Sequence, residues 1–163
     1  PGERIGIVIG EESLINVLQT LQTQLCIHYT RYGQAIAARA INSGRLADLS
    51  ETVIRPHYQE KFDVLAEALE ASMPPNLPYY LHAGEGAIFA WLWFRDLPIS
   101  DRELYQQIKE VGVIVVPGEP FFPGLREDWD HKQQCLRISL TATASELATA
   151  MERIAIVVEQ VYR

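Results

Sequence analysis

Cysteine and histidine are scarce in this 163-residue chain, and neither forms a cluster. The two cysteines, Cys26 and Cys135, lie far apart without a CxxC pair, and the four histidines have no metal-ligand spacing. These patterns argue against a zinc site and against the dense disulfide framework of small secreted domains. We therefore expect no metal site and a reducing, cytoplasmic location.

The sequence also lacks a basic run and a long apolar run. Its formal net charge is −7, so nothing in it resembles the basic patch that binds a nucleic-acid backbone. The apolar stretch at residues 86–94 is too short to span a bilayer. We expect neither a nucleic-acid nor a membrane partner. Apolar residues make up 48% of the chain, which is enough to bury a core.

The first 44 residues have the pattern of one strand followed by helices. Residues 4–10 (RIGIVIG) are apolar and β-branched from Ile5, which predicts a buried strand. Leucines at helical spacing after Glu11 predict a helix, and residues 34–42 predict a short helix that ends near Gly44. A strand of this kind needs cover on both faces. We interpret residues 1–44 as the remnant of a larger domain, and we expect the chain either to self-associate through residues 5–25 or to be disordered there.

A second helical region is expected over residues 46–72, interrupted before Pro56, because proline disfavours a helical residue in front of it. The segment Met73-Pro74-Pro75-Asn76 ends this region, so residues 45–76 are assigned to an interdomain helical region.

Residues 77–163 alternate between strand and helix signals in the order β-β-α-β-loop-β-α. Strands are expected at 79–82, 87–94, 113–116 and 136–140. Ser100 and Glu103 form a capping box before the first helix, and a final amphipathic helix ends the chain. The pattern predicts a small α+β domain whose helices pack on one small sheet.

Two arginines are candidates for anion binding. In Leu136-Arg137-Ile138-Ser139-Leu140 the alternation places Arg137 on the face opposite the apolar residues. Such a face is usually solvated, but a guanidinium fixed on a strand is also suited to bind a carboxylate through two parallel hydrogen bonds. Arg4 leaves the same choice between a surface residue at the start of a strand and an anion anchor.

The loop 115–124 holds two adjacent phenylalanines between prolines and glycines that restrict its backbone. Phe121 and Phe122 are either a core plug beneath the loop or an apolar wall for a small substrate side chain. The alternation of Trp91 and Trp93 favours a strand face packed in the core over a stacking platform.

Several of these stretches, in this order, resemble the fold-type-I aminotransferases that depend on pyridoxal phosphate. Pro1-Gly2-Glu3-Arg4-Ile5-Gly6 resembles the end of the family's Gly-Leu-Pro-Gly-x-Arg-x-Gly stretch. Val116-Pro117-Gly118 and Leu136-Arg137-Ile138-Ser139 resemble its Val-Pro-Gly turn and its arginine-bearing strand. Residues 49–54, 85–94, 121–125 and 131–137 are similar to the valine–pyruvate aminotransferases within that family. Residues 28–34 depart from the family's small-residue loop, so no site residue is assigned there.

The resemblance implies an α+β small C-terminal domain with a mostly antiparallel sheet, preceded by a fragment of the large α/β domain. It implies that Arg4 pairs with the phosphate of pyridoxal 5′-phosphate, that Arg137 binds the substrate carboxylate, and that Phe121 and Phe122 line the pocket for an aliphatic side chain. The family's Schiff-base lysine is expected upstream of Pro1. The chain therefore contains no catalytic residue and is expected to be inactive alone.

The function implied for the intact protein is amino-group transfer between valine or alanine and a 2-oxo acid. Its expected partners are small amino acids, 2-oxo acids and further copies of itself. Two alternatives stay open, namely the sensing half of a transcription regulator and a catalytically inactive interaction domain.

Overall fold

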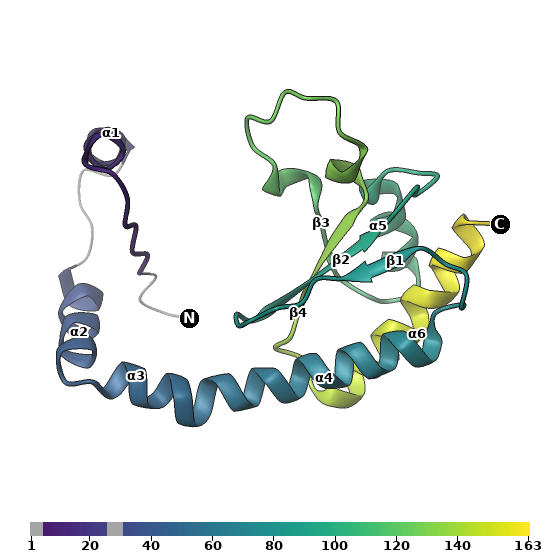
Figure 1. The fold of residues 1–163 in the computed structure, drawn as a ribbon, viewed down its shortest axis with the longest axis horizontal. Helices are drawn as coiled ribbons and strands as arrows, with labels where there is room; N and C mark the ends of the chain where they lie inside the picture. Colours follow the sequence, from purple (N-terminus) through teal and green to yellow (C-terminus); the bar gives the residue numbers. More distant parts are fainter. Residues whose placement is uncertain (1–4, 26–30) are drawn as a thin grey trace. The chain divides into compact units, whose positions relative to one another are not determined.

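A computed structural model describes residues 5–25 and 31–163 of the chain (Figure 1). The chain divides into two compact units, Pro1–Thr52 and Val53–Arg163. No helix in the described ranges is long and apolar enough to cross a membrane.

The first unit is helical. Helix α1 spans Glu12–Leu25, α2 spans Arg31–Asn42 and α3 spans Arg45–Leu49. The predicted helix after Glu11 is confirmed, whereas α2 includes Gly33 and begins earlier than the predicted residue 34. Gly44 has a left-handed backbone (φ 76°), which suits the predicted end of the helix because glycine adopts this conformation at little steric cost.

The strand predicted at residues 4–10 is wrong for the part that the structure describes. Residues 5–10 have no regular secondary structure and are exposed. A strand is stable only when its backbone N–H and C=O groups pair with a neighbouring strand. Within residues 5–25 and 31–52 there is no strand to supply that pairing.

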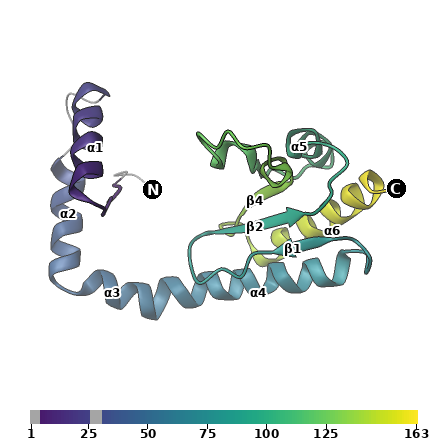
Figure 2. The same cartoon turned by 45° about the horizontal axis from the view of Figure 1, so that its top comes forward.

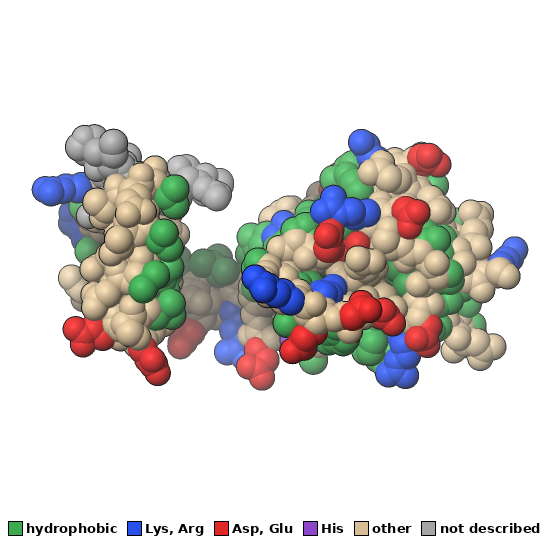
Figure 3. All heavy atoms as spheres, turned by 90° about the horizontal axis from the view of Figure 1, so that it is seen from above, with side chains coloured by type: hydrophobic (Ala, Val, Ile, Leu, Met, Phe, Trp, Pro, Cys, Tyr) green, Lys and Arg blue, Asp and Glu red, His purple; other side chains and the backbone are tan. Residues whose placement is uncertain are grey.

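Apolar side chains remain exposed in this first unit. Along α1 the exposed residues are Leu14, Val17, Leu18, Leu21 and Leu25. Figure 3 shows hydrophobic side chains gathered along one side of the unit. The predicted self-association through residues 5–25 stays a prediction, and the exposed stripe is the surface on which it depends.

The interruption predicted before Pro56 is a π-helical segment, η1, at Ser50–Ile54. Helix α4 follows without a break at Arg55–Ser72, and Pro56 in its first turn lacks the N–H that a continuing helix would use. Leu65 and Leu69 of α4 are fully buried. The helix ends at Met73, as the Met-Pro-Pro-Asn segment predicts.

The second unit is built on a four-stranded antiparallel sheet in the order β1-β2-β4-β3 (Figures 1 and 2). The strands are β1 Tyr79–Leu81, β2 Phe89–Phe94, β3 Val116–Pro117 and β4 Cys135–Ser139. The strand predicted at 113–116 is mostly wrong. Val113 donates instead to the carbonyl of Ile108 at the end of α5, and the pairing to β4 begins only at Val116.

Two helices with strong N-terminal caps follow the predicted pattern. Helix α5 spans Asp101–Glu110 and α6 spans Ala144–Val161. Ser100 with Glu103 forms the predicted capping box, and Thr143 with Glu146 forms a second one before α6.

The core lies between one face of the sheet and the helices. Figures 1 and 2 show α4 and α6 along this face. The core residues contributed by the strands are Ala90, Leu92, Phe94, Leu136 and Ile138. They pack against Leu65 and Leu69 of α4, Leu104 and Ile108 of α5, and Leu147, Met151, Ile154 and Val158 of α6. The α+β architecture predicted from the sequence is confirmed. The opposite face of the sheet does not take part in this core.

Candidate substrate-binding site

Arg137 lies in the middle of β4 on the face of the sheet opposite the helices. Its neighbours Leu136 and Ile138 point into the core and are buried. Across the sheet Arg137 pairs with Trp91 of β2 on one side and Val116 of β3 on the other. The alternation predicted for this strand is therefore observed, and it places the arginine on a rigid central strand.

The guanidinium of Arg137 lies over two aromatic rings. Its Cζ lies 4.1 Å from the ring centroid of Phe89 and 4.8 Å from that of Phe121. Both rings attract the cation through their π faces. Contact with aromatic rings is compatible with hydrogen bonds from the N–H groups of an arginine to a ligand.

Arg137 Nε is buried and has no hydrogen-bond partner among the described residues. Buried polar groups are normally paired, so an unpaired N–H on a charged group indicates a place for an acceptor. Nε belongs to the planar fork that binds a carboxylate through two parallel hydrogen bonds. The arrangement fits a carboxylate ligand better than the solvated strand face that the sequence left open.

Phe121 and Phe122 belong to the segment that crosses this face of the sheet. Phe121 ends the short 3-10 helix η2 (Glu119–Phe121), and its ring packs edge-on against Trp91 with centroids 5.5 Å apart. Phe122 contacts Trp91 at 6.1 Å and Trp129 at 5.6 Å. Neither phenylalanine is part of the main core, and Phe121 lies directly beside Arg137. These contacts favour the apolar wall over the core plug.

Trp91 and Trp93 correct the expectation that they pack in the core. Both are half-buried on the face that carries Arg137. Trp93 stacks on Tyr80 with centroids 4.8 Å apart and also packs edge-on against His131. The sequence pattern was ambiguous because a strand face packed under a helix and one packed under a loop have the same alternation.

A pocket of about 570 Å³ opens within this aromatic face. Its walls are Tyr80, Leu81, His82, Ala83, Trp91, Trp93, Phe121, Phe122 and His131. Trp91 and Phe121 belong both to this pocket and to the surroundings of Arg137. An apolar space therefore adjoins the guanidinium of Arg137.

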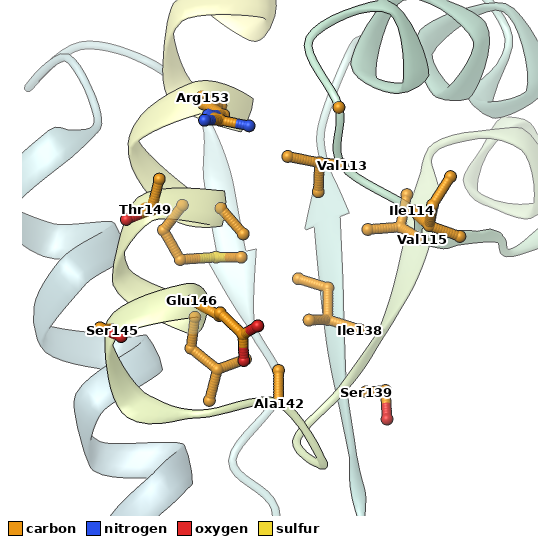
Figure 4. A pocket seen from close by; sticks show the side chains of 14 residues that line it. Val113, Ile114, Val115, Ile138, Ser139, Ala142, Ser145, Glu146, Thr149 and Arg153 are labelled. Carbon is orange, nitrogen blue, oxygen red and sulfur yellow. The ribbon is translucent and has the colours of Figure 1, made fainter.

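A second cavity, of about 460 Å³, lies on the other side of β4 (Figure 4). Ile138, Val113, Glu146 and Arg153 are among the residues that line it, and Arg153 donates to the carbonyl of Val111. Because Ile138 and Arg137 point to opposite faces of the sheet, this cavity is separate from the arginine site.

Two titratable groups near the site are shifted by burial. Burial raises the pKa of the Cys135 thiol to about 12, so this cysteine stays a neutral thiol. Burial also lowers the pKa of His131, which favours the neutral imidazole. The cation of this face that lies over Phe89 and Phe121 is Arg137.

The other predicted site residue, Arg4, lies outside the described residues. Its assignment to the cofactor phosphate therefore stays a prediction from the resemblance. Sequence reasoning missed Phe89, because the register that places it beside Arg137 depends on the pairing of β2 with β4. Phe89, Trp91 and Trp93 are alternate residues of β2 and therefore lie on the same face, and this alternation could have identified Phe89 as part of the site.

The family comparison agrees with this geometry. A family model described as aminotransferase class I and II matches residues 1–154. The chain belongs to the class I and II aminotransferase family.

Individual relatives point to one part of that family. The chain is 35% identical to the valine–pyruvate aminotransferase of Escherichia coli K12. The 162 aligned residues cover 99% of this chain and 39% of the relative. It is 31% identical to an uncharacterised aminotransferase of Saccharolobus solfataricus, over 75% of this chain and 29% of that protein. The chain thus spans about two fifths of the length of its E. coli relative.

Solved structures give the same result. A putative amino-acid aminotransferase from Psychrobacter arcticum superposes with a TM-score of 0.81 at 35% identity, covering 99% of this chain and 37% of the other. Valine–pyruvate aminotransferase AvtA from Salmonella typhimurium superposes with a TM-score of 0.77 at 32% identity, covering 95% and 40%.

Proposed function

We propose that this chain supplies the substrate-carboxylate site of a pyridoxal-phosphate-dependent aminotransferase. The intact protein would transfer an amino group between valine or alanine and a 2-oxo acid, and would work as a homo-oligomer. The observation that carries the proposal is Arg137, whose guanidinium lies over the rings of Phe89 and Phe121 and whose buried Nε has no hydrogen-bond partner among the described residues. The names of the two valine–pyruvate relatives support the choice of substrates.

The geometry explains how a carboxylate would be fixed. Packing against the rings of Phe89 and Phe121 limits the motion of the guanidinium, so less side-chain entropy is lost when it binds a planar carboxylate. Two parallel hydrogen bonds then fix the orientation of the substrate as well as its position. Orientation at the carboxylate determines where the Cα–H bond points, which is the main contribution a protein makes to such a reaction.

The apolar side chains beside Arg137 explain the preference for an aliphatic substrate. Phe121 and Trp91 present ring surface next to the guanidinium, and Phe122 extends that surface. An alkyl group bound against these rings is removed from water, and each Å² of apolar area buried in this way contributes about 25 cal/mol to binding. A charged side chain would lose hydration there without finding a partner.

The cofactor contributes the chemistry that the chain itself lacks. When bound, pyridoxal phosphate supplies the electron sink that stabilises a carbanion at the substrate Cα. We assign Arg4 to its phosphate by a charge-assisted contact and place the catalytic lysine upstream of Pro1. Both assignments rest on the family resemblance.

Substitution of Arg137 in the intact protein tests the carboxylate site. Arg137→Lys keeps the charge but loses the planar fork, and Arg137→Met loses both. Loss of one partner from a buried charged pair costs about 2–5 kcal/mol, or roughly 30-fold to several-thousand-fold in kcat/KM for valine and pyruvate. A variant at Arg137 that stays within about threefold of wild type would show the assignment to be wrong.

Arg95→Lys is the matched control. Arg95 lies on the same aromatic face, 4.9 Å from the ring of Tyr80 and 5.2 Å from that of Trp93, without contact to Phe121. The control should leave kcat/KM nearly unchanged. If the intact protein binds amino acids or the cofactor without any turnover, the sensing function replaces the enzymatic one.

A further inference from the structure

Asp101 is a buried carboxyl group at the first residue of α5. Its residue is only 1% exposed, and it is the one charged side chain buried in the described part of the chain. Its Oδ2 accepts a hydrogen bond of 2.9 Å from the backbone N–H of Glu119. Its Oδ1 has no hydrogen-bond partner among the described residues. A carboxyl kept in such a place costs stability unless it stabilises something else.

The segment bonded to Asp101 is the one that carries Phe121. The N–H of Gly118 donates to the carbonyl of Cys135 at 2.8 Å, and the N–H of Phe121 donates to the carbonyl of Gly118 at 2.9 Å. The hydrogen bond from the Glu119 N–H thus attaches η2 to Asp101 of α5, and the bond from the Gly118 N–H attaches it to β4. Phe121 is the last residue of that turn.

The side chain of Glu119 plays a different part from its backbone. It pairs with Arg102 on the surface, where both side chains are largely exposed. Exposed ion pairs contribute little to stability. The buried contact between Asp101 and the Glu119 N–H therefore holds the turn, and the surface ion pair does not.

The geometry points to Asp101 as a positioning residue that holds the Phe121 ring beside the Arg137 guanidinium. The inference rests on the proposed function, because it describes how the carboxylate site of that enzyme is kept in place. Asp101 does not contact the substrate itself and would affect it only through the backbone of Gly118–Glu119 and the ring of Phe121. Its loss should let the ring move and should weaken substrate binding through Arg137.

The test uses Asp101→Ser and Asp101→Asn in the intact protein, with Glu119→Gln as the matched control. Serine is too short to reach the Glu119 N–H but is small, polar and tolerated at a helix start. Asparagine keeps an acceptor oxygen at the same distance and should rescue the contact. Glu119→Gln removes the surface ion pair and leaves the backbone donor in place.

Amide hydrogen exchange at Glu119 reports on the hydrogen bond to Asp101 and does not depend on enzymatic activity. Exchange should be fast in Asp101→Ser, and as slow as wild type in Asp101→Asn and in Glu119→Gln. Unchanged exchange in a folded Asp101→Ser protein would overturn the inference. If wild type shows no turnover and no carboxylate binding, the proposed function fails, and the exchange result still decides whether the contact holds the turn.

A double-mutant cycle with Phe121→Leu tests the second step. Asp101→Ser should raise KM for the amino acid about tenfold with a smaller change in kcat, because it loosens a binding group; a misplacement of about 1 Å can cost up to about 100-fold in catalytic efficiency. In the Phe121→Leu background the same substitution should change KM less than about twofold. Equal effects in the two backgrounds would mean that Asp101 does not act through Phe121, and would refute the inference.

Discussion

Gly118→Ala should displace the turn that carries Phe121, because Gly118 lies unusually close to β4. A Cβ at Gly118 would meet the Cβ of Cys135 at 2.6 Å and its carbonyl oxygen at 3.0 Å. Carbon atoms in contact normally lie about 3.5–4.0 Å apart. The obstacle is the strand itself and not the end of a flexible side chain, so either the turn or the strand must move by about 1 Å.

The free energy of unfolding should fall by about 1–2 kcal/mol. Overpacking typically costs about 1–3 kcal/mol. Part of this cost is offset because alanine has less freedom than glycine in the unfolded chain, an effect of about 0.4–1 kcal/mol. The backbone of Gly118 (φ −76°, ψ −31°) is favourable for alanine, so the loss comes from the close approach alone.

Urea unfolding measures the free energies of unfolding of Gly118→Ala and of the control Gly86→Ala. A Cβ at Gly86 meets nothing within 4 Å, so this control should change stability by less than about 0.5 kcal/mol. In the intact enzyme Gly118→Ala should also raise KM, because the displaced turn carries Phe121 away from Arg137. Equal stability of Gly118→Ala and wild type would refute the close-packing argument, whatever the activity.

Three further predictions concern other parts of the chain. Iodoacetamide at pH 8 should not label Cys135 in the folded protein and should label it in urea, because burial raises its pKa to about 12; peptide mapping separates it from Cys26. Thr143→Ala should cost about 1 kcal/mol at pH 7, since it removes a cap of α6. The hydrogen bonds from Thr143 lower the pKa of Glu146 below its unfolded value of 4.5. This cap therefore stabilises the protein above pH 4.5, and the stabilisation is lost as the pH falls through the folded pKa. The cost of Thr143→Ala should shrink accordingly on acidification. Leu18→Glu, within the exposed stripe of α1, should shift light scattering from oligomer towards monomer, and an unchanged mass would argue against association through this helix.

Features that depend on a few neighbouring residues were predictable from the sequence. The capping box of Ser100 and Glu103 is such a feature, since the side chains that satisfy the backbone lie three residues apart. The end of α2 near Gly44 is another. The opposite orientations of Arg137 and Ile138 followed from strand alternation alone.

Features that depend on distant pairing were not predictable. Residues 5–10 have every local property of a strand, yet the described residues of that unit offer no strand to pair with them. The short length of β3 reflects competition, since Val113 bonds to the end of α5 instead of to β4. The position of Phe89 beside Arg137 required the register of β2 on β4, which no single segment specifies.

The distribution of unsatisfied groups links the fold to the proposed site. The buried side-chain atoms without hydrogen-bond partners, among the residues described, are Arg137 Nε and Asp101 Oδ1. Both residues contact the segment from Gly118 to Phe121, the first through the ring of Phe121 and the second through the N–H of Glu119. Elsewhere the second unit has a closed apolar core and capped helices. Unpaired buried polar groups cost free energy, so their concentration at one turn is unfavourable for stability alone. In the proposed site, a carboxylate bound to Arg137 would satisfy one of them, which gives this turn a role in binding and not in stability.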